Sequence, residues 1–283
     1  MSTYVFSRRG FIAACAASPL ILTAKTNIPV GLELYSVRNE LKEDLPGTLK
    51  AVSGDGYQCV EFFAPYHDWT VDYARDVRKM LDQTNLRCFS THNNLDYFNE
   101  DQIGKTIELN GALGSRYAIV ASAGKPDTLD GWKAIAAKLN QASERLASHH
   151  LRVGYHNHEL EFTPLNGTRP MEILARNTNH DVVLQLDVGT CVQAGSDPVA
   201  WIKQNPGRIR SIHCKDWSPK QGYRVLLGEG VAPWKAIFAA AESVGGVEYY
   251  LVEQEGSRYS EFETAKLCLE SFKKLHGESQ SAT

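Results

Sequence analysis

Residues 182–215 read VVLQLDVGTCVQAGSDPVAWIKQNPGRIRSIHCK, and this stretch predicts one strand–helix–strand unit. The runs Val182–Asp187 and Ile209–Lys215 are apolar over the length of a buried strand and turn polar at their last residues. Between them, Pro198–Gln204 begins with proline and has the apolar spacing of a helix. Because two strands joined through a helix lie parallel in one sheet, the stretch indicates a parallel sheet covered by helices.

The same alternation continues outward along the chain. Six more strands are expected at Val30–Ser36, Gln58–Phe63, Leu86–Thr91, Arg116–Ala121, Leu151–Asn157 and Glu248–Gln254. Seven more helices are expected at Asp44–Val52, Val71–Leu81, Asp101–Leu109, Leu129–Ala147, Pro170–Arg176, Ala232–Val244 and Glu261–Leu275. Eight strands in strict alternation with eight helices predict an α/β fold, a closed (β/α)8 TIM barrel over residues 28–276. A doubly wound open sheet is the alternative, but no glycine-rich phosphate-binding turn follows the first strand.

Length and composition fit a single barrel domain. The chain has 283 residues, of which 43% are hydrophobic and 22% are charged, as in a globular protein with a sizeable core. A net charge of −3 gives no basic surface for nucleic acid, so no nucleic-acid partner is expected. The expected partner is a small-molecule substrate, and an oligomer remains open.

Residues 1–24 have the pattern of a bacterial export signal. Ser7-Arg8-Arg9-Gly10-Phe11-Ile12 precedes the alanine-rich stretch Ala13–Ala24. Two arginines before a moderately apolar segment predict a twin-arginine signal peptide, and therefore a periplasmic protein with no membrane anchor after processing. A disordered tail or a general secretory signal is the alternative. At the other end, residues 277–283 are expected to form a flexible tail.

The cysteines give no sign of a disulfide framework or a zinc site. Cys15 lies in the predicted signal, and the chain contains no C-x-x-C pair. The other five are expected to be buried thiols because most lie in apolar, strand-like runs: Cys59, Cys88, Cys191, Cys214 and Cys268.

Polar side chains collect at the C-terminal ends of the last four expected strands, where a barrel places its active site. The fifth strand leads into Tyr155-His156-Asn157-His158-Glu159-Leu160-Glu161-Phe162. The sixth ends at Asp187, the seventh carries His213, and the eighth carries Glu253. Carboxylates and imidazoles at one site suit a single divalent ion (Mn, Mg, Co or Zn), and the acidic groups would repel each other without it. The sequence therefore predicts a metal centre.

These strand ends resemble the xylose isomerase-like TIM barrel superfamily, in its sugar phosphate isomerase/epimerase branch. The similarity extends from Ile28 to Leu275 and is carried by Leu32–Arg38, Tyr155–Phe162, Leu186–Gly189, His213–Trp217, Gly228–Gly230 and Val252–Glu255. The resemblance implies one divalent ion held by Glu, Asp, His and Glu from strands five to eight. Asp187, His213 and Glu253 match three of these ligands.

The ligand from the fifth strand is open between two residues. His156 stands where many relatives carry Glu, whereas the His-Asn-His-x-x-Glu-Phe pattern of this branch favours Glu161. In that case His156 and His158 face the substrate, and Glu159 is a weaker acidic candidate. We therefore expect metal ligands Glu161, Asp187, His213 and Glu253, with His156 as the alternative to Glu161.

Three further residues are candidates for substrate binding. His92 ends the third strand, and Lys215 points to the same side of its strand as His213 because two positions separate them. Glu229 lies between two glycines in a loop. Each could instead have a purely structural role. His92 could cap a helix, Lys215 could pair with nearby carboxylates, and Glu229 could be an ordinary turn residue.

The expected chemistry is proton abstraction next to a sugar carbonyl, through a metal-stabilised enediolate. Glu161 or His158 is expected to act as one acid/base. Glu253 is expected to be a metal ligand that also acts as the second acid/base. Return of the proton makes the protein a sugar isomerase or epimerase. Loss of a β-substituent makes it instead a lyase or hydratase acting on 3-keto-glycosides. Because phosphorylated sugars are mainly cytoplasmic, the export signal favours an unphosphorylated keto-sugar.

Two other classes stay open. A phosphodiesterase like the DNA-repair endonuclease branch would need several more metal ligands on strands two to four, where the chain offers mainly Glu61, His67 and His92. A non-catalytic periplasmic sugar-binding barrel would keep the fold without the chemistry.

Overall fold

The structure is a computed structural model that describes residues 28–280. The predicted signal peptide, residues 1–24, lies outside the described residues. The end of the barrel differs from the expectation, because the last helix continues through Gln280 and includes part of the segment expected to be a flexible tail.

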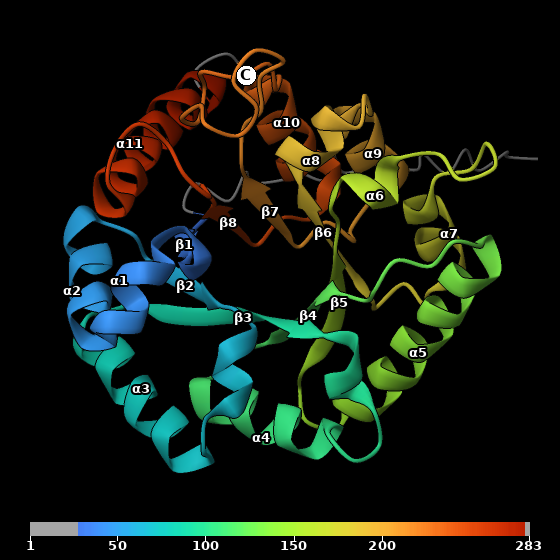
Figure 1. Ribbon diagram of the computed structural model, residues 1–283, viewed down its shortest axis with the longest axis horizontal. Coiled ribbons are helices and arrows are strands. Elements are labelled where there is room, and N and C mark those ends of the chain that lie inside the picture. Colours follow the sequence, from blue (N-terminus) through green and yellow to red (C-terminus); the bar gives the residue numbers. More distant parts are fainter. Residues whose placement is uncertain (1–27, 281–283) are drawn as a thin grey trace, which may run out of the picture.

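Eight parallel strands form a closed barrel in which each strand pairs with the next in sequence and the last pairs with the first (Figure 1). They are β1 (Val30–Glu33), β2 (Cys59–Phe62), β3 (Arg87–Asn94), β4 (Tyr117–Ser122), β5 (Arg152–His156), β6 (Val183–Asp187), β7 (Ser211–Cys214) and β8 (Tyr249–Val252). The predicted α/β barrel is confirmed.

The helices surround this ring of strands (Figure 1). The longer ones are α2 (Leu45–Asp55), α3 (Val71–Gln83), α4 (Ile103–Leu113), α5 (Leu129–Ala147), α7 (Pro170–Asn177), α9 (Pro198–Gln204), α10 (Trp234–Ala240) and α11 (Glu261–Gln280). A π-helical turn, η4 (Ala241–Gly245), extends α10. Side-chain caps explain several helix starts: Asp44 accepts the N–H of Gly47, and Thr128 accepts that of Gly131.

Short helical segments follow several strands directly and were not expected from the sequence. They are η1 (Leu34–Val37), α1 (Arg38–Glu43), η2 (Ala64–Asp68), η3 (Leu95–Phe98), α6 (Glu159–Phe162) and α8 (Val188–Gln193). Because they follow the ends of strands, directly or, for α1, after η1, they build the C-terminal mouth of the barrel.

The barrel interior is apolar in its N-terminal half and polar in its C-terminal half. A separate buried cluster fills the N-terminal half, comprising Cys59, Phe89, Tyr117, Ile119, Val183, Tyr249 and Leu251. Side chains two positions apart point to the same side of a strand. Residues two positions after members of this cluster, such as Glu61, Gln185 and Glu253, therefore also point inward, and all three are buried.

Two further observations concern membrane-spanning helices and the cysteines. Among residues 28–280, no helix is both long enough and apolar enough to span a bilayer. The five cysteines of this region are all buried free thiols.

Candidate metal centre at the C-terminal mouth

Four adjacent strands bring two imidazoles and two carboxylates together. His156 ends β5, Asp187 ends β6, His213 lies on β7, and Glu253 follows β8 directly. All four are buried, and one ligand atom from each lies within 4.8 Å of the others. This donor set is of the kind that binds divalent transition metals, so the cluster could hold a metal ion.

Asp187 provides an independent test of that fit. Its Oδ1 accepts the N–H of Thr190 at 2.8 Å, but its Oδ2 is buried and has no hydrogen-bond partner. The nearest nitrogen atoms are Nζ of the Lys215 ammonium at 3.7 Å and Nε2 of the His156 ring at 3.9 Å, both too far for a hydrogen bond. A buried carboxylate oxygen without a partner is costly. A cation between the four residues would satisfy it, so the residues fit a divalent ion.

His156, and not the favoured Glu161, completes the cluster. Glu161 lies in the short helix α6, where its Oε1 accepts the hydroxyl of Tyr155 at 2.8 Å. Its Oε2 accepts the backbone N–H of His158 at 2.7 Å. Both carboxylate oxygens are therefore engaged in holding the turn after β5. The strand itself presents His156 to the other three residues.

Glu61 and His92 lie beside the cluster, and both contact His213. Nε2 of His213 is 2.8 Å from Oε1 of Glu61, and Nδ1 of His213 is 2.5 Å from Oε2 of Glu253. The same Oε1 of Glu61 is 3.0 Å from Nε2 of His92. The rings of His92 and His213 are stacked, with centroids 5.1 Å apart. His92, expected to bind substrate, thus lies within the buried network.

Gln185 ties the network together. Its Oε1 is 2.7 Å from Nε2 of His92 and 2.9 Å from Nδ1 of His156. Its Nε2 donates to Oε2 of Glu61 and to Oγ of Ser211, each at 3.0 Å. These bonds fix the ring orientations of the histidines, as groups around a metal site commonly do.

The charges in the cluster and beside it shift the pKa values of these side chains in opposite directions. Burial raises the pKa of Glu61, but the positive charges of His92 and His213 outweigh this and hold it well below its usual range. Burial lowers the pKa of His213, but Glu61 and Glu253 raise it to about 10. For His156, burial and the neighbouring His213 and His92 keep the pKa well below its ordinary value. The ring of His156 is thus neutral, which is the form that binds a metal.

Lys215 lies among three carboxylates at the mouth. Its Nζ is 3.2 Å from Oε1 of Glu253, approaches Asp187, and forms a short ion pair with Glu255. Burial lowers the pKa of Lys215, but these acidic neighbours raise it well above the ordinary value. The ammonium also lies 4.7 Å from the ring centroid of Tyr223. Lys215 is therefore a charged group fixed beside the candidate metal ligands.

His158 occupies the rim of the site. Its side chain is exposed, and its ring centroid is 5.1 Å from that of His156. It is thus open to a molecule that enters the mouth and is close to the cluster.

Glu229 is not part of the cluster. Its two carboxylate oxygens accept hydrogen bonds from the two terminal nitrogens of Arg258, at 2.7 and 3.0 Å. Glu229 also accepts a hydrogen bond from the backbone N–H of Leu226. The structure therefore gives Glu229 a contact within the loops around the mouth. His67, a possible ligand in the nuclease interpretation, is stacked on Tyr97 and bound to Thr106.

Glu33 is a buried carboxylate that was not singled out from the sequence. It ends β1, and its Oε2 accepts the N–H of Tyr35 at 2.8 Å, while Oε1 is buried without a partner. Burial and the nearby carboxylates of Glu253 and Glu61 raise its pKa well above the usual range. Gln185 could have been found from the sequence, because it lies two positions before Asp187 and therefore points to the same side of the strand. No comparable signal distinguishes Glu33.

Comparison with known proteins identifies relatives in sequence and in fold. An inosose dehydratase of Clostridium botulinum (strain Eklund 17B / Type B) is 28% identical over 151 residues, which are 48% of this chain and 50% of that protein. One of Geobacillus thermodenitrificans (strain NG80-2) is 25% identical over 146 residues, 45% of this chain and 48% of that protein. The chain thus spans about half the length of the curated relatives it matches.

The similarity in three dimensions covers nearly the whole barrel. The crystal structure of a sugar phosphate isomerase/epimerase from Parabacteroides distasonis ATCC 8503 superimposes with a TM-score of 0.76 and 25% identity. The superposition covers 91% of this chain and 97% of that one. The model of the xylose isomerase-like TIM barrel family matches residues 49–275, most of the chain. The chain therefore belongs to the xylose isomerase-like TIM barrel family.

Proposed function

We propose that this protein is a divalent-metal-dependent isomerase or epimerase that removes a proton next to the carbonyl group of a sugar or keto-sugar. The observation that carries the proposal is the buried convergence of His156, Asp187, His213 and Glu253 within 4.8 Å. Similarity to a sugar phosphate isomerase/epimerase over most of the chain supports the same class of reaction.

His156, Asp187, His213 and Glu253 would hold the ion, which is Mn, Mg, Co or Zn. When bound, the ion supplies positive charge that polarises a carbonyl and stabilises the negative charge that develops on its oxygen. The unpartnered Oδ2 of Asp187 supports this assignment of ligands.

His158 is the acid/base that we propose for proton transfer. It is exposed at the mouth and lies beside His156, whereas both oxygens of Glu161 are engaged by Tyr155 and by its own turn. An imidazole can both accept and donate a proton, which suits removal and return of a proton at the same carbon. Lys215, a fixed ammonium at the same mouth, donates a hydrogen bond to a substrate oxygen.

A lyase that eliminates water is the second candidate. It is favoured by the inosose dehydratases to which the chain is similar over about half its length. The first step, removal of the proton next to a carbonyl, is common to both reactions. The Lys215–Glu255 pair could then hold the proton that a leaving hydroxyl needs. The two candidates differ in the second step, which is return of the proton in one and loss of water in the other, and therefore in the product.

We propose an unphosphorylated keto-sugar as substrate and the periplasm as location. Both rest on the twin-arginine pattern of residues 1–24. Fractionation of the native host should then yield the processed protein in the periplasm. Recovery of the unprocessed chain from the cytoplasm alone would contradict this location.

Incubation of the metal-loaded protein with a 3-keto-glucoside in deuterated water tests the function. Deuterium at the carbon next to the carbonyl, with unchanged substrate mass otherwise, indicates isomerase or epimerase action, whereas loss of water or of the aglycone indicates the lyase. Glu253→Gln and His158→Ala should lose exchange, and Glu248→Gln, at the opposite end of the barrel, should retain it. Tight sugar binding without any exchange or product would identify a non-catalytic barrel and contradict the proposal.

A further inference from the structure

Arginines gather at the end of the barrel opposite the candidate metal centre. Arg87 and Arg152 are the first residues of β3 and β5, and Arg116 and Arg210 immediately precede β4 and β7. Because the strands are parallel, all four positions lie at the N-terminal mouth. This concentration of positive charge occurs in a chain whose net charge is −3.

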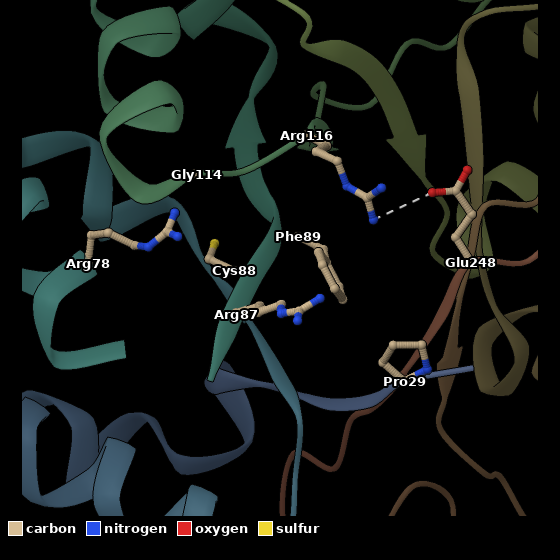
Figure 2. Close-up of a pocket in the computed structure, with 8 residues that line it drawn as sticks. All are labelled: Pro29, Arg78, Arg87, Cys88, Phe89, Gly114, Arg116 and Glu248. Carbon is tan, nitrogen blue, oxygen red and sulfur yellow. Dashed lines mark ion pairs between the residues drawn. The ribbon is translucent and has the colours of Figure 1, made fainter. Parts of the chain in front are cut away.

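A hollow of about 400 Å³ opens beside two of these arginines. Its wall includes Arg78, Arg87, Phe89, Arg116 and Glu248, and Figure 2 shows the three arginines around it, with Phe89 beside Arg87 and Arg116. The guanidinium of Arg116 lies over the ring of Phe89, with its Cζ 4.8 Å from the centroid. The ring thus fixes one cationic group at the edge of the hollow.

The nearby carboxylate does not saturate these cations. Glu248 is shared between Arg116, at 3.6 Å, and Arg210, at 3.4 Å, and one of its oxygens also accepts the hydroxyl of Tyr117 at 2.8 Å. Both arginine distances exceed the 2.7–2.9 Å typical of a strong charge-assisted bond. Among residues 28–280, Arg87 makes no ion pair within 4.0 Å. Each guanidinium has five N–H donors, so Arg87 and Arg116, which line the hollow, have more donors than the described residues supply acceptors for.

Arg78 has a different role. Its Nε binds Asp82 at 2.9 Å, and its Nη1 donates to the carbonyl of Leu113 at 3.2 Å, at the end of α4. A Cβ at Gly114 would lie 1.7 Å from that nitrogen, so the glycine leaves room for the guanidinium. Arg78 is thus held as part of the wall, and the unsatisfied charge belongs to Arg87 and Arg116.

We propose that this hollow binds a small oxyanion with two or more negative charges, held between Arg87 and Arg116. Planar guanidinium groups bind phosphate-like and carboxylate oxygens through paired hydrogen bonds. The site is separate from the metal centre and does not depend on the proposed reaction. If Arg116 served only to form an ion pair, Glu248 at 3.6 Å, which it shares with Arg210, would be a poor match for it.

Inorganic sulfate is a suitable probe because it is a dianion and a weak ligand for divalent metals. The full-length protein with its metal is titrated with sulfate at constant ionic strength, and backbone amide NMR shifts are followed. We expect saturable shifts at Arg87, Phe89, Gly114 and Arg116, and none of that kind with chloride. Arg87→Gln combined with Arg116→Gln should weaken binding by at least about tenfold.

Two single variants make the test specific. Arg145→Gln is a matched control, because its side chain is 53% exposed, as that of Arg116 is 52% exposed, and it lies elsewhere on α5; sulfate affinity should be unchanged. Glu248→Gln should bind sulfate more tightly, since it removes the competing negative charge. Circular dichroism checks that each variant is folded. Equal binding by the wild type and the double variant, or shifts confined to the metal centre, would overturn the proposal.

Discussion

Nε2 of His213 and Oε1 of Glu61 lie 2.8 Å apart, although the two residues come from β7 and β2. This contact occupies one ring nitrogen of His213 and leaves the other, Nδ1, facing Glu253 at 2.5 Å. In metal sites, a carboxylate bound to the second nitrogen of a ligating histidine fixes the ring and strengthens the ligand. Glu61 has that position relative to His213, the ligand that we propose.

The first prediction concerns this carboxylate. Glu61→Gln keeps the shape of the side chain but removes the charge that orients His213 and His92. We expect affinity for Zn or Mn to fall by about 10- to 100-fold, with the fold retained. Isothermal titration calorimetry of the metal-free variant measures it. Glu248→Gln makes the same chemical change at the other end of the barrel and should leave metal affinity unchanged; equal losses in both variants would refute a specific role for Glu61.

The second prediction distinguishes the two candidates for the ligand from β5. His156→Ala removes a member of the buried cluster, so metal content after dialysis should fall to near background. Glu161→Gln should retain the metal, since its oxygens bind Tyr155 and the N–H of His158. It should instead lower the free energy of unfolding by about 1–3 kcal/mol, because the turn loses charged hydrogen bonds. Metal analysis and urea unfolding of both variants provide the comparison, and the reverse pattern would restore Glu161 as the ligand.

The fold could be predicted because strands buried on both faces appear as continuous apolar runs, separated by helical spacing. The limits of α5 and α9 agree with the prediction, whereas β1 ends at Glu33 and not at Ser36. The reason is local: Leu34–Val37 turns into a short 3-10 helix, and such a turn leaves no periodic signal.

The site was less predictable than the fold. Asp187, His213 and Glu253 stand at strand ends, where the change from apolar to polar residues is visible in the sequence. The choice between His156 and Glu161 depended on the direction of the chain after β5, where a capping interaction turns Glu161 toward the backbone of His158. Glu61 appeared only as a possible ligand in the nuclease alternative, and Gln185 was missed although it lies two positions before Asp187. The partners that these two residues bind depend on contacts between strands far apart in sequence.

The third prediction concerns the loop between β7 and α10. Oδ2 of Asp216 accepts the N–H groups of Gly228, at 2.9 Å, and Gly230, at 3.2 Å, and the indole N–H of Trp234 at 2.8 Å. Asp216→Asn places an amide among these donors and removes the charge. We expect the free energy of unfolding to fall by about 2–4 kcal/mol and the loop to become sensitive to limited proteolysis.

The control for this loop is an exposed aspartate on α5. Asp130 is 88% exposed and pairs with Lys133, so Asp130→Asn should change stability by less than about 0.5 kcal/mol. Similar losses in the two variants would show that Asp216 does not organise the loop.

The last prediction is a loss of stability at alkaline pH caused by buried thiols. Burial raises the pKa of Cys268, on α11, to about 11. In the unfolded chain the thiol ionises near its ordinary pKa, so above that value the unfolded state loses a proton that the folded state keeps. The contribution is therefore complete below the unfolded pKa and is lost as pH rises toward about 11.

Urea unfolding under reducing conditions, from about pH 8 to about pH 10, measures this effect. The free energy of unfolding should fall steadily over that range, and Cys268→Ala should show a shallower fall because it lacks one of the ionising groups. The full contribution of Cys268, between its ordinary pKa and its raised one, is about 2–3 kcal/mol. Because the substitution also leaves a small cavity, the slopes with pH are compared and not the absolute stabilities. Parallel slopes would mean that Cys268 ionises as readily in the folded protein as in the unfolded chain, and therefore that its burial in the helix layer does not hold the proton.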